Sequence, residues 1–526
     1  MRKLECDFLI QEEVAPASVQ GCLDELQVLQ SLKPTYTPLK RNVKRLVFFE
    51  YRDKKHADLF VGSVEEAARP ARRSSDRTAF REVAKNQDIR CLGYLLLYSD
   101  SCQGIPLSSY IPEAVIVEPS SFPHYYVHSK ATFPLTTLGQ PFGVLGSYFA
   151  QQEGAVNCCA QAAVKAVLKN LATMTGVDVD IPYTQMNAHL CIDHKTRHAK
   201  NGCFPEEIGE LLRGVGMESA ILDHAAGGES TADAIIDTAY YAVECGLPAI
   251  LCFGGKRVMH AMAVVGHTFD PRLWSATAAA AYFPSDRTYM PSHSWMQDLL
   301  VQDDKVGPYC TLQRATLANR KPLVIIPRFP DSMMESPESV EQSVSSLFSE
   351  RRFGNQTFFS KLNEFAEKKG AQSYWLDKLL EHVSSGTFVL RTLRTTADAY
   401  CDFLKNNGMD VDMINEVKDR LAGRRTIWLV ELSIPELFQI NNCRLGEVLL
   451  AEDVVGAKKS PKEDLELCAV RIPGVLTVVD SSGGISSYPI PAMQDYYPIL
   501  LLKPNELTSH FDGIHPFSPA AARLRD

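Results

Sequence analysis

Two adjacent cysteines stand at the start of a predicted helix, in the stretch QEGAVNCCAQAAVKAVLKNL that begins at Gln152. Behind the pair, apolar residues recur three and four positions apart from Ala160 to Met174, which is the spacing of one helical face. Lys165 and Lys169 are expected on the opposite, polar face. A helix of this kind places the thiols of its first turn at the positive end of the helix dipole.

These residues predict nucleophilic chemistry. A thiol attacks a carbonyl group only as the thiolate, so its pKa must lie below the usual value of about 8.5, and a helix N-terminus or a nearby imidazolium lowers it. Cys158 is the expected nucleophile, and Gln152 would supply a side-chain amide to the oxyanion. His260 opens the apolar strand HAMAVVGH and is the expected general base. Asp303 or Asp304, at the end of the next apolar strand, would orient the imidazole.

This constellation resembles the active site of the papain-like cysteine peptidases, and most of all that of the bacteriocin-leader (double-glycine) peptidase family. In that family a glutamine stands six residues before the nucleophile, which opens an Ala/Ser-rich helix. The histidine opens an apolar strand that ends in glycine, and an aspartate closes the following strand. Gln152, Cys158, His260 and Asp303 match these positions. The resemblance implies a Cys-His-Asp triad and a thioester intermediate.

The resemblance covers about residues 146–315, and the chain departs from the family at three points. Cys159 stands where the family has a smaller residue, and Asp304 stands where proline is usual. The interval between the histidine and the aspartate is long, at 43 residues. An insertion at about 268–296 is therefore expected to form a lid or a substrate loop. Both Asp303 and Asp304 stay open as the orienting residue.

The choice between the two cysteines depends on the residue six positions upstream. For Cys159 that residue is Glu153, whose carboxylate would repel a forming oxyanion, so Cys158 is preferred. The alternative is that both thiols are small buried side chains at a helix start, and that His260 is a structural histidine. His267, at the far end of the strand, is assigned to structure.

A second set of residues has the composition of a zinc site. Cys191, His194, His198 and Cys203 follow the pattern C-x2-H-x3-H-x4-C. The set lies between two predicted helices, where the resembled family has a plain loop, so a polar loop is the preferred interpretation. No metal ion or cofactor is therefore expected.

Composition excludes several classes of protein. The chain has 526 residues and a net charge of −9, and no basic stripe with interleaved aromatic residues, so nucleic-acid binding is not expected. No apolar run approaches the roughly 18 residues of a membrane span. The first residues turn acidic before an apolar core can form, which is atypical of a secretory signal. Fourteen scattered cysteines without a framework spacing indicate free thiols in a reducing cytoplasm.

The pattern of helices and strands predicts an α+β protein with four regions. A strand-rich region at 1–145 precedes the papain-like domain at 146–315, a mostly helical segment follows at 316–424, and a second strand-rich region spans 425–526. One interpretation packs the two strand-rich regions together. The expected activity is that of a cysteine peptidase or amide hydrolase acting on a peptide or protein. A transglutaminase-like acyltransferase and a catalytically silent scaffold are the alternatives. The double-glycine specificity is not carried over, because no transporter segment accompanies the domain.

Overall fold

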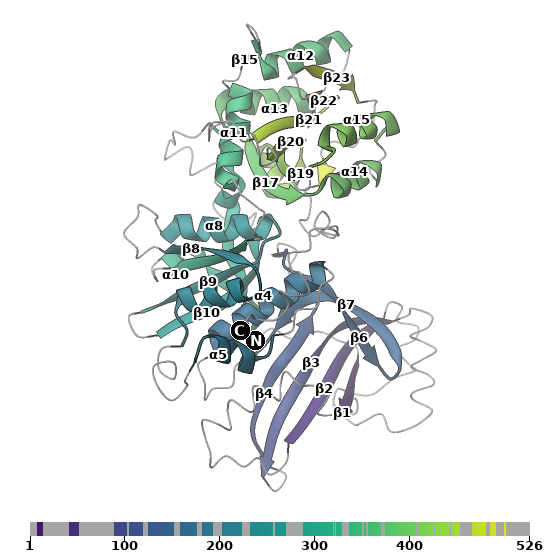
Figure 1. Cartoon of the computed structure of the whole chain (residues 1–526). Helices are drawn as coiled ribbons and strands as arrows, with labels where there is room; N and C mark the ends of the chain where they lie inside the picture. The colour runs from purple at the N-terminus through teal and green to yellow at the C-terminus, as the bar shows by residue number, and fades with distance from the viewer. Residues whose placement is uncertain are drawn as a thin grey trace.

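Three large β-sheets divide this computed structural model into an N-terminal, a central and a C-terminal unit (Figure 1). Helices and strands occur together, so the fold class is α+β. Among the described residues, no helix is both long and apolar enough to cross a membrane. The structure describes residues 8–13, 41–51, 89–102, 105–118, 125–151, 158–175, 181–192, 202–223, 232–255, 258–269, 288–318, 320, 322–328, 336–349, 352–353, 356–369, 374–406, 409–424, 427–441, 443–452, 465–479, 484–490 and 499–500.

The N-terminal unit is a six-stranded antiparallel sheet in the order β1-β2-β3-β4-β7-β6. Buried and exposed residues alternate along β6, because one face of the sheet covers a core and the other meets solvent. The buried face shares one hydrophobic core with helix α4 of the central unit. The strands are β1 (Phe8–Glu13), β2 (Arg41–Tyr51), β3 (Ile89–Cys102), β4 (Ile105–Ile116), β6 (Ala131–Thr137) and β7 (Gln140–Phe149).

The central unit is a seven-stranded sheet with helices on both faces. Its middle strands are apolar on each side: Ile250 packs into the core that contains α4, whereas its neighbour Leu251 packs into the core that contains α8. The strands are β5 (Tyr125–Val127), β8 (Glu218–Asp223), β9 (Ala249–Gly255), β10 (Val258–Phe269), β12 (Met296–Asp303), β13 (Gly307–Gln313) and β14 (Leu323–Arg328). The helices are α4 (Cys159–Thr175), α5 (Tyr183–His189), α7 (Pro205–Gly214), α8 (Ala232–Glu244) and α10 (Arg314–Ala318).

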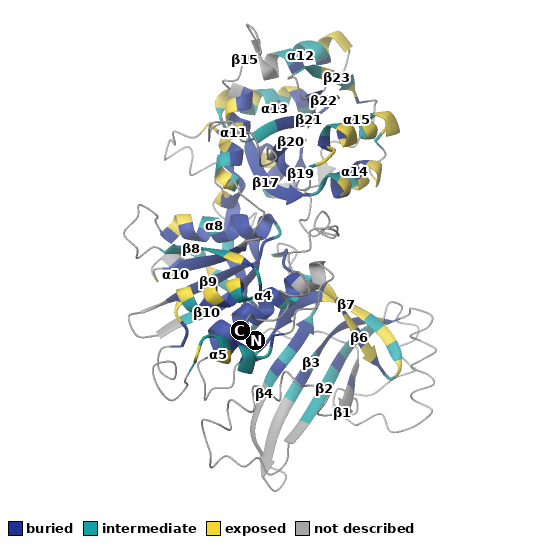
Figure 2. Ribbon diagram, viewed as in Figure 1, coloured by how far each residue is buried: buried dark blue, intermediate teal, exposed yellow. Residues whose placement is uncertain are grey.

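Helix α4 is buried on every side, because the N-terminal sheet and the central sheet enclose it (Figure 2). The sequence analysis placed Lys165 and Lys169 on a polar face, and for Lys165 this is wrong. Lys165 is only 4% exposed, and its ammonium group lies 5.2 Å from the centre of the Tyr183 ring. A cation over an aromatic ring keeps a favourable electrostatic contact when it loses water. The polar residue therefore fits inside the core without breaking the helix.

The C-terminal unit is a sheet in the order β11-β17-β18-β20-β21-β22-β23 with helices on two faces. Helices α11 (Pro337–Ser349), α12 (Phe358–Lys369) and α13 (Tyr374–Ser385) share one core with the sheet, and α14 (Ala397–Asn406) and α15 (Val411–Leu421) share another. The strands are β11 (Met290–Pro291), β17 (Val389–Thr395), β18 (Ile427–Ser433), β20 (Gly446–Glu452), β21 (Leu465–Ile472), β22 (Val475–Val479) and β23 (Ile485–Pro489). Short elements complete it: β15 (Arg352–Phe353), β16 (Gln356–Thr357), η5 (Leu437–Asn441), β19 (Cys443–Arg444) and β24 (Ile499–Leu500).

The three sheets do not coincide with the four regions that the sequence predicts. Strand β14 belongs to the central sheet, although it lies beyond the expected end of that domain at residue 315. The segments 316–424 and 425–526 are not separate, because β17 from the first pairs with β18 from the second. The two strand-rich regions form different sheets rather than one unit. The amphipathic pattern of the helices at 316–424 predicts that they cover a sheet, but it does not indicate which sheet.

The insertion at 268–296 ends on the C-terminal sheet. Strand β11 pairs in parallel with β17, and the Met290 N–H donates to the Phe388 carbonyl at 2.8 Å. A single turn of 3-10 helix, η4 (Ser292–Trp295), follows before β12. Residues 270–287, where a lid was expected, lie outside the described residues. The described end of the insertion joins the central unit to the C-terminal unit.

Gly266 explains why the apolar strand of the sequence motif ends in glycine. Strand β5 pairs with β10 at this point, opposite Val127. A Cβ atom at position 266 would lie 2.0 Å from the backbone oxygen of Tyr126, far inside van der Waals contact. The absent side chain therefore lets β5 reach the sheet.

We expect Gly266→Ala to lower the free energy of unfolding of the central unit by about 1–3 kcal/mol, because the backbone of β5 must move. Gly143→Ala is the matched control, since its added methyl group meets the movable Cγ2 atom of Thr132 at an exposed site. Urea unfolding of both variants measures the difference. An equal effect of the two substitutions would show that the contact with β5 is not responsible.

Candidate active site

His260 and Asp303 lie next to each other on paired antiparallel strands. His260 belongs to β10, and Asp303 is the last residue of β12, which pairs directly with β10. His260 Nε2 lies 3.1 Å from Asp303 Oδ1 and donates a hydrogen bond to it. The long sequence interval between the two residues therefore does not separate them. This bond uses Nε2 and leaves Nδ1 as the ring nitrogen that can exchange a proton with a nucleophile.

The turn that follows β12 fixes the Asp303 carboxylate. The backbone N–H groups of Lys305 and Val306 both donate to Oδ1, at 2.9 and 3.3 Å. Burial acts to raise the pKa of Asp303, but the hydrogen bonds from His260 and from these backbone groups outweigh it and lower the pKa. Asp303 is therefore ionised at neutral pH, as an orienting carboxylate must be.

Asp304 brings a second carboxyl group to the same imidazole. Its Oδ1 lies 3.5 Å from His260 Nε2, and its side chain is 3% exposed. Neither oxygen of Asp304 makes a hydrogen bond within the described part of the chain. Burial raises the pKa of Asp304 to about 6, and the charge of Asp303 adds to this effect while His260 opposes it. The shorter contact and the fixed geometry identify Asp303 as the orienting residue.

Cys159, the neighbour of the expected nucleophile, is a thiol that acts on His260. Cys158 caps α4, since its carbonyl accepts the N–H of Ala162 at 3.0 Å, and Cys159 is the first helical residue. The Cys159 side chain acts on the imidazole and raises the pKa of His260. Cys159 also lies in the core shared with Ala261 of β10, and its charge acts on Cys252 of β9. Cys158 therefore stays a prediction, and Cys159 becomes a second candidate nucleophile.

The surroundings of His260 favour its charged form. Burial acts to lower its pKa, but Asp303, Cys159 and Asp304 together raise the pKa to about 9. Nδ1 is buried and has no hydrogen-bond partner of regular geometry within the described residues. The Phe253 ring stands edge-on to the imidazole, with centroids 6.1 Å apart and an interplanar angle of 88°.

The other predicted residues are not brought to this site by the described structure. Gln152, the expected oxyanion donor, lies outside the described residues. His267 is fully buried and contacts Glu244 and His128 instead. Among the expected zinc ligands, Cys191 is exposed, Cys203 is buried in a hydrophobic core, and His194 and His198 lie outside the described residues. Every described cysteine is a free thiol.

A helical pattern in the sequence could have identified Cys159. Cys159, Ala163 and Ala166 are spaced four and three residues apart, so they lie along one line of α4. Small residues along a line let a helix approach a sheet closely, and these three belong to the core that contains Ala261 and Ala263 of β10. A thiol at the start of this line faces the strand that carries the histidine. The spacing from Gln152 favours Cys158 instead, and Gln152 lies outside the described residues.

No model of a known protein family and no curated protein matches the sequence.

We expect the His260 imidazole to titrate well above its usual pKa of about 6.5, and two substitutions to lower that pKa. Cys159→Ala removes the thiolate charge, and Asp303→Asn removes the carboxylate. Cys158→Ala, the matched control, should leave the pKa unchanged. Since the pKa is raised on folding, protonated His260 stabilises the fold fully below about pH 6.5, and this contribution is lost as the pH rises through 9. NMR titration of histidine-labelled protein measures the pKa, and a shift in Cys158→Ala but not in Cys159→Ala would contradict the assignment.

Proposed function

We propose that this chain is a papain-like cysteine hydrolase that cleaves an amide bond in a peptide or protein substrate. The observation that carries the proposal is the pairing of His260 Nε2 with Asp303, with Cys159 at the N-terminus of a buried helix acting on the same ring. A nucleophile, a base and an orienting carboxylate in this order form the triad arrangement that recurs on unrelated folds. The proposal also agrees with the resemblance of the sequence to papain-like peptidases.

The thiolate of Cys159 would attack the carbonyl carbon of the substrate and form a carbon–sulfur bond. The first N–H groups of a helix have no acceptor in the preceding turn, so the start of α4 would offer donors to the oxyanion. Protonated His260 would then give its proton to the leaving amine as the carbon–nitrogen bond breaks, leaving a thioester. His260 would next take a proton from water, and the resulting hydroxide would displace the thiol. Gln152 stays a prediction as a second oxyanion donor.

We expect iodoacetamide to alkylate Cys159 faster than any other cysteine of the folded chain, because the helix N-terminus and His260 favour its thiolate. Peptide mapping by mass spectrometry gives the rate at each thiol. On a synthetic peptide library, Cys159→Ala should lower kcat/KM by about a thousandfold or more, whereas Cys158→Ala should retain activity close to wild type.

Two experimental outcomes would contradict the proposal, and each favours a different function. If Cys159 reacts no faster than the buried Cys252 and no peptide is cleaved, the papain-like unit is a binding or scaffold module. If added primary amine appears in the products in place of water, the same thioester serves acyl transfer. Mass spectrometry of the products with and without the amine separates hydrolysis from transfer.

A further inference from the structure

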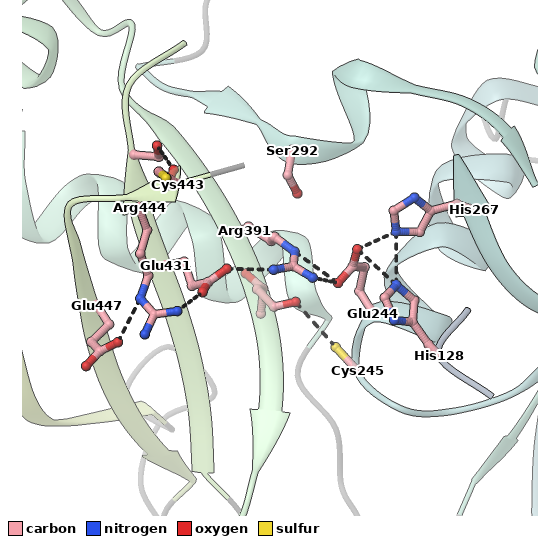
Figure 3. Close-up of polar contacts among 12 residues, drawn as sticks. His128, Glu244, Cys245, His267, Ser292, Arg391, Glu431, Cys443, Arg444 and Glu447 are labelled. Atoms are coloured by element: carbon pink, nitrogen blue, oxygen red, sulfur yellow. Dashed lines mark hydrogen bonds and ion pairs between the residues drawn. The ribbon is translucent and has the colours of Figure 1, made fainter. Parts of the chain in front are cut away.

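A second cluster of ionisable side chains lies on the same strand as His260, inside the protein. His128, Glu244 and His267 form this buried His–Glu–His cluster, and their side chains are at most 2% exposed. His128 follows β5, Glu244 ends α8, and His267 lies on β10. Figure 3 shows the two rings and the carboxylate turned toward one another. The proposed hydrolase mechanism uses none of these residues.

The three facing atoms form a small triangle. His128 Nε2 lies 3.0 Å from His267 Nε2, and Glu244 Oε1 lies 2.5 Å from His267 Nε2 and 3.3 Å from His128 Nε2. An ion placed about 1 Å out of the plane of these atoms would be about 2.1 Å from each, which is a normal distance for a metal bound by imidazole and carboxylate. The side chains could bind such an ion with little movement.

Protons cannot satisfy all three contacts at once. An uncharged imidazole carries one N–H, and a carboxylate carries none. If both Nε2 atoms were protonated, their hydrogens would face each other across 3.0 Å. If one were protonated, the lone pair of the other ring would face the Glu244 oxygen. A cation accepts all three lone pairs, and two imidazoles with one carboxylate are a ligand set that transition metals prefer.

Groups around the cluster hold its ligands in place. Arg391 donates to the other Glu244 oxygen, Oε2, from Nε at 3.0 Å and from a terminal nitrogen at 2.7 Å, so Oε1 stays directed at the histidines. The Tyr126 ring stacks on His267, with centroids 5.3 Å apart and an interplanar angle of 13°. Such outer contacts orient ligands in metal sites.

The ionised side chains that continue from Arg391 affect which ligands could accompany a metal ion at the cluster. Arg391, Glu431, Arg444 and Glu447 form a ladder of alternating ion pairs across the C-terminal sheet (Figure 3). Arg471 extends this ladder by pairing with Glu447. With Glu244 included, three carboxylates balance three guanidinium groups. A divalent ion adds charge to this balanced set, so an anionic fourth ligand such as hydroxide is needed to offset part of it.

We propose that His128, Glu244 and His267 bind one divalent transition-metal ion, with Zn²⁺ as the ion to test. The ion would join the segment after β5, the end of α8 and strand β10, and so would have a structural role. The proposal is independent of the hydrolase proposal, because neither Cys159 nor His260 contributes a ligand.

The test uses the full chain without a polyhistidine tag, purified from cells grown with added ZnCl2. We expect inductively coupled plasma mass spectrometry to find about one zinc ion per chain. Chelation of the zinc should lower Tm by about 5 °C or more, and added ZnCl2 should restore it. Glu244→Gln and His267→Gln should lose the metal. His260→Gln is the matched control and should keep it, since among the described residues His260, Asp303 and Asp304 form a second group that could bind an ion.

A measurement on the unmodified chain covers the case in which the variants fail to fold. After exchange with CoCl2, the absorption spectrum should show ligand-field bands and no sulfur-to-cobalt charge transfer, because the proposed ligands are nitrogen and oxygen. Charge transfer from sulfur would place the ion elsewhere, as in the Cys191–Cys203 loop. Less than about 0.1 ion per chain, both as purified and after refolding with ZnCl2, would overturn the proposal in favour of a shared-proton cluster.

Discussion

The packing of α4 against β10 is the contact on which the rest of the structure depends. The helix is enclosed by two sheets, and its line of small residues meets the apolar face of the central sheet. This close approach places the first residue of the helix, Cys159, beside His260. The same strand receives β5 at Gly266 and β12 along its other edge, and β12 carries Asp303. One strand therefore positions every member of the proposed triad.

The other end of β10 contacts buried charged groups as well as apolar side chains. His267 meets Glu244, and Arg391 joins Glu244 to the ladder of ion pairs that crosses the C-terminal sheet. Glu431 pairs with Arg391 across neighbouring strands, and Glu447 pairs with Arg471 in the same way. Removing one member of such a buried pair costs about 3–5 kcal/mol, because a charge is left without a partner. The ladder therefore fixes how the C-terminal sheet meets the central unit.

Much of the candidate site could be predicted from local sequence, and the misplaced parts share one cause. The helix after the cysteines, the apolar strand at His260 and the aspartate at the end of the next apolar strand follow from periodicity and residue type. The choice between Cys158 and Cys159 could not be made from a spacing count, because the count does not contain the rotation of a helix. Lys165 was misplaced because the helical pattern shows only that it lies opposite the apolar face. The pattern does not show that a second sheet covers this side of the helix. The pairing of β17 with β18 joins the expected helical region to the strands after it, and no local pattern in the sequence shows this long-range pairing.

The sequence by itself determined which residue types stand at the helix start, on the strand and at the turn, because these follow from short-range periodicity and capping. Only the tertiary structure decided which side chains of α4 pack against β10, since that depends on how the helix rotates against the strand. It also decided that His128 and His267, 139 residues apart, meet at Glu244. No local pattern marks such a meeting, because the free energy that creates it comes from burying whole sheets and helices together.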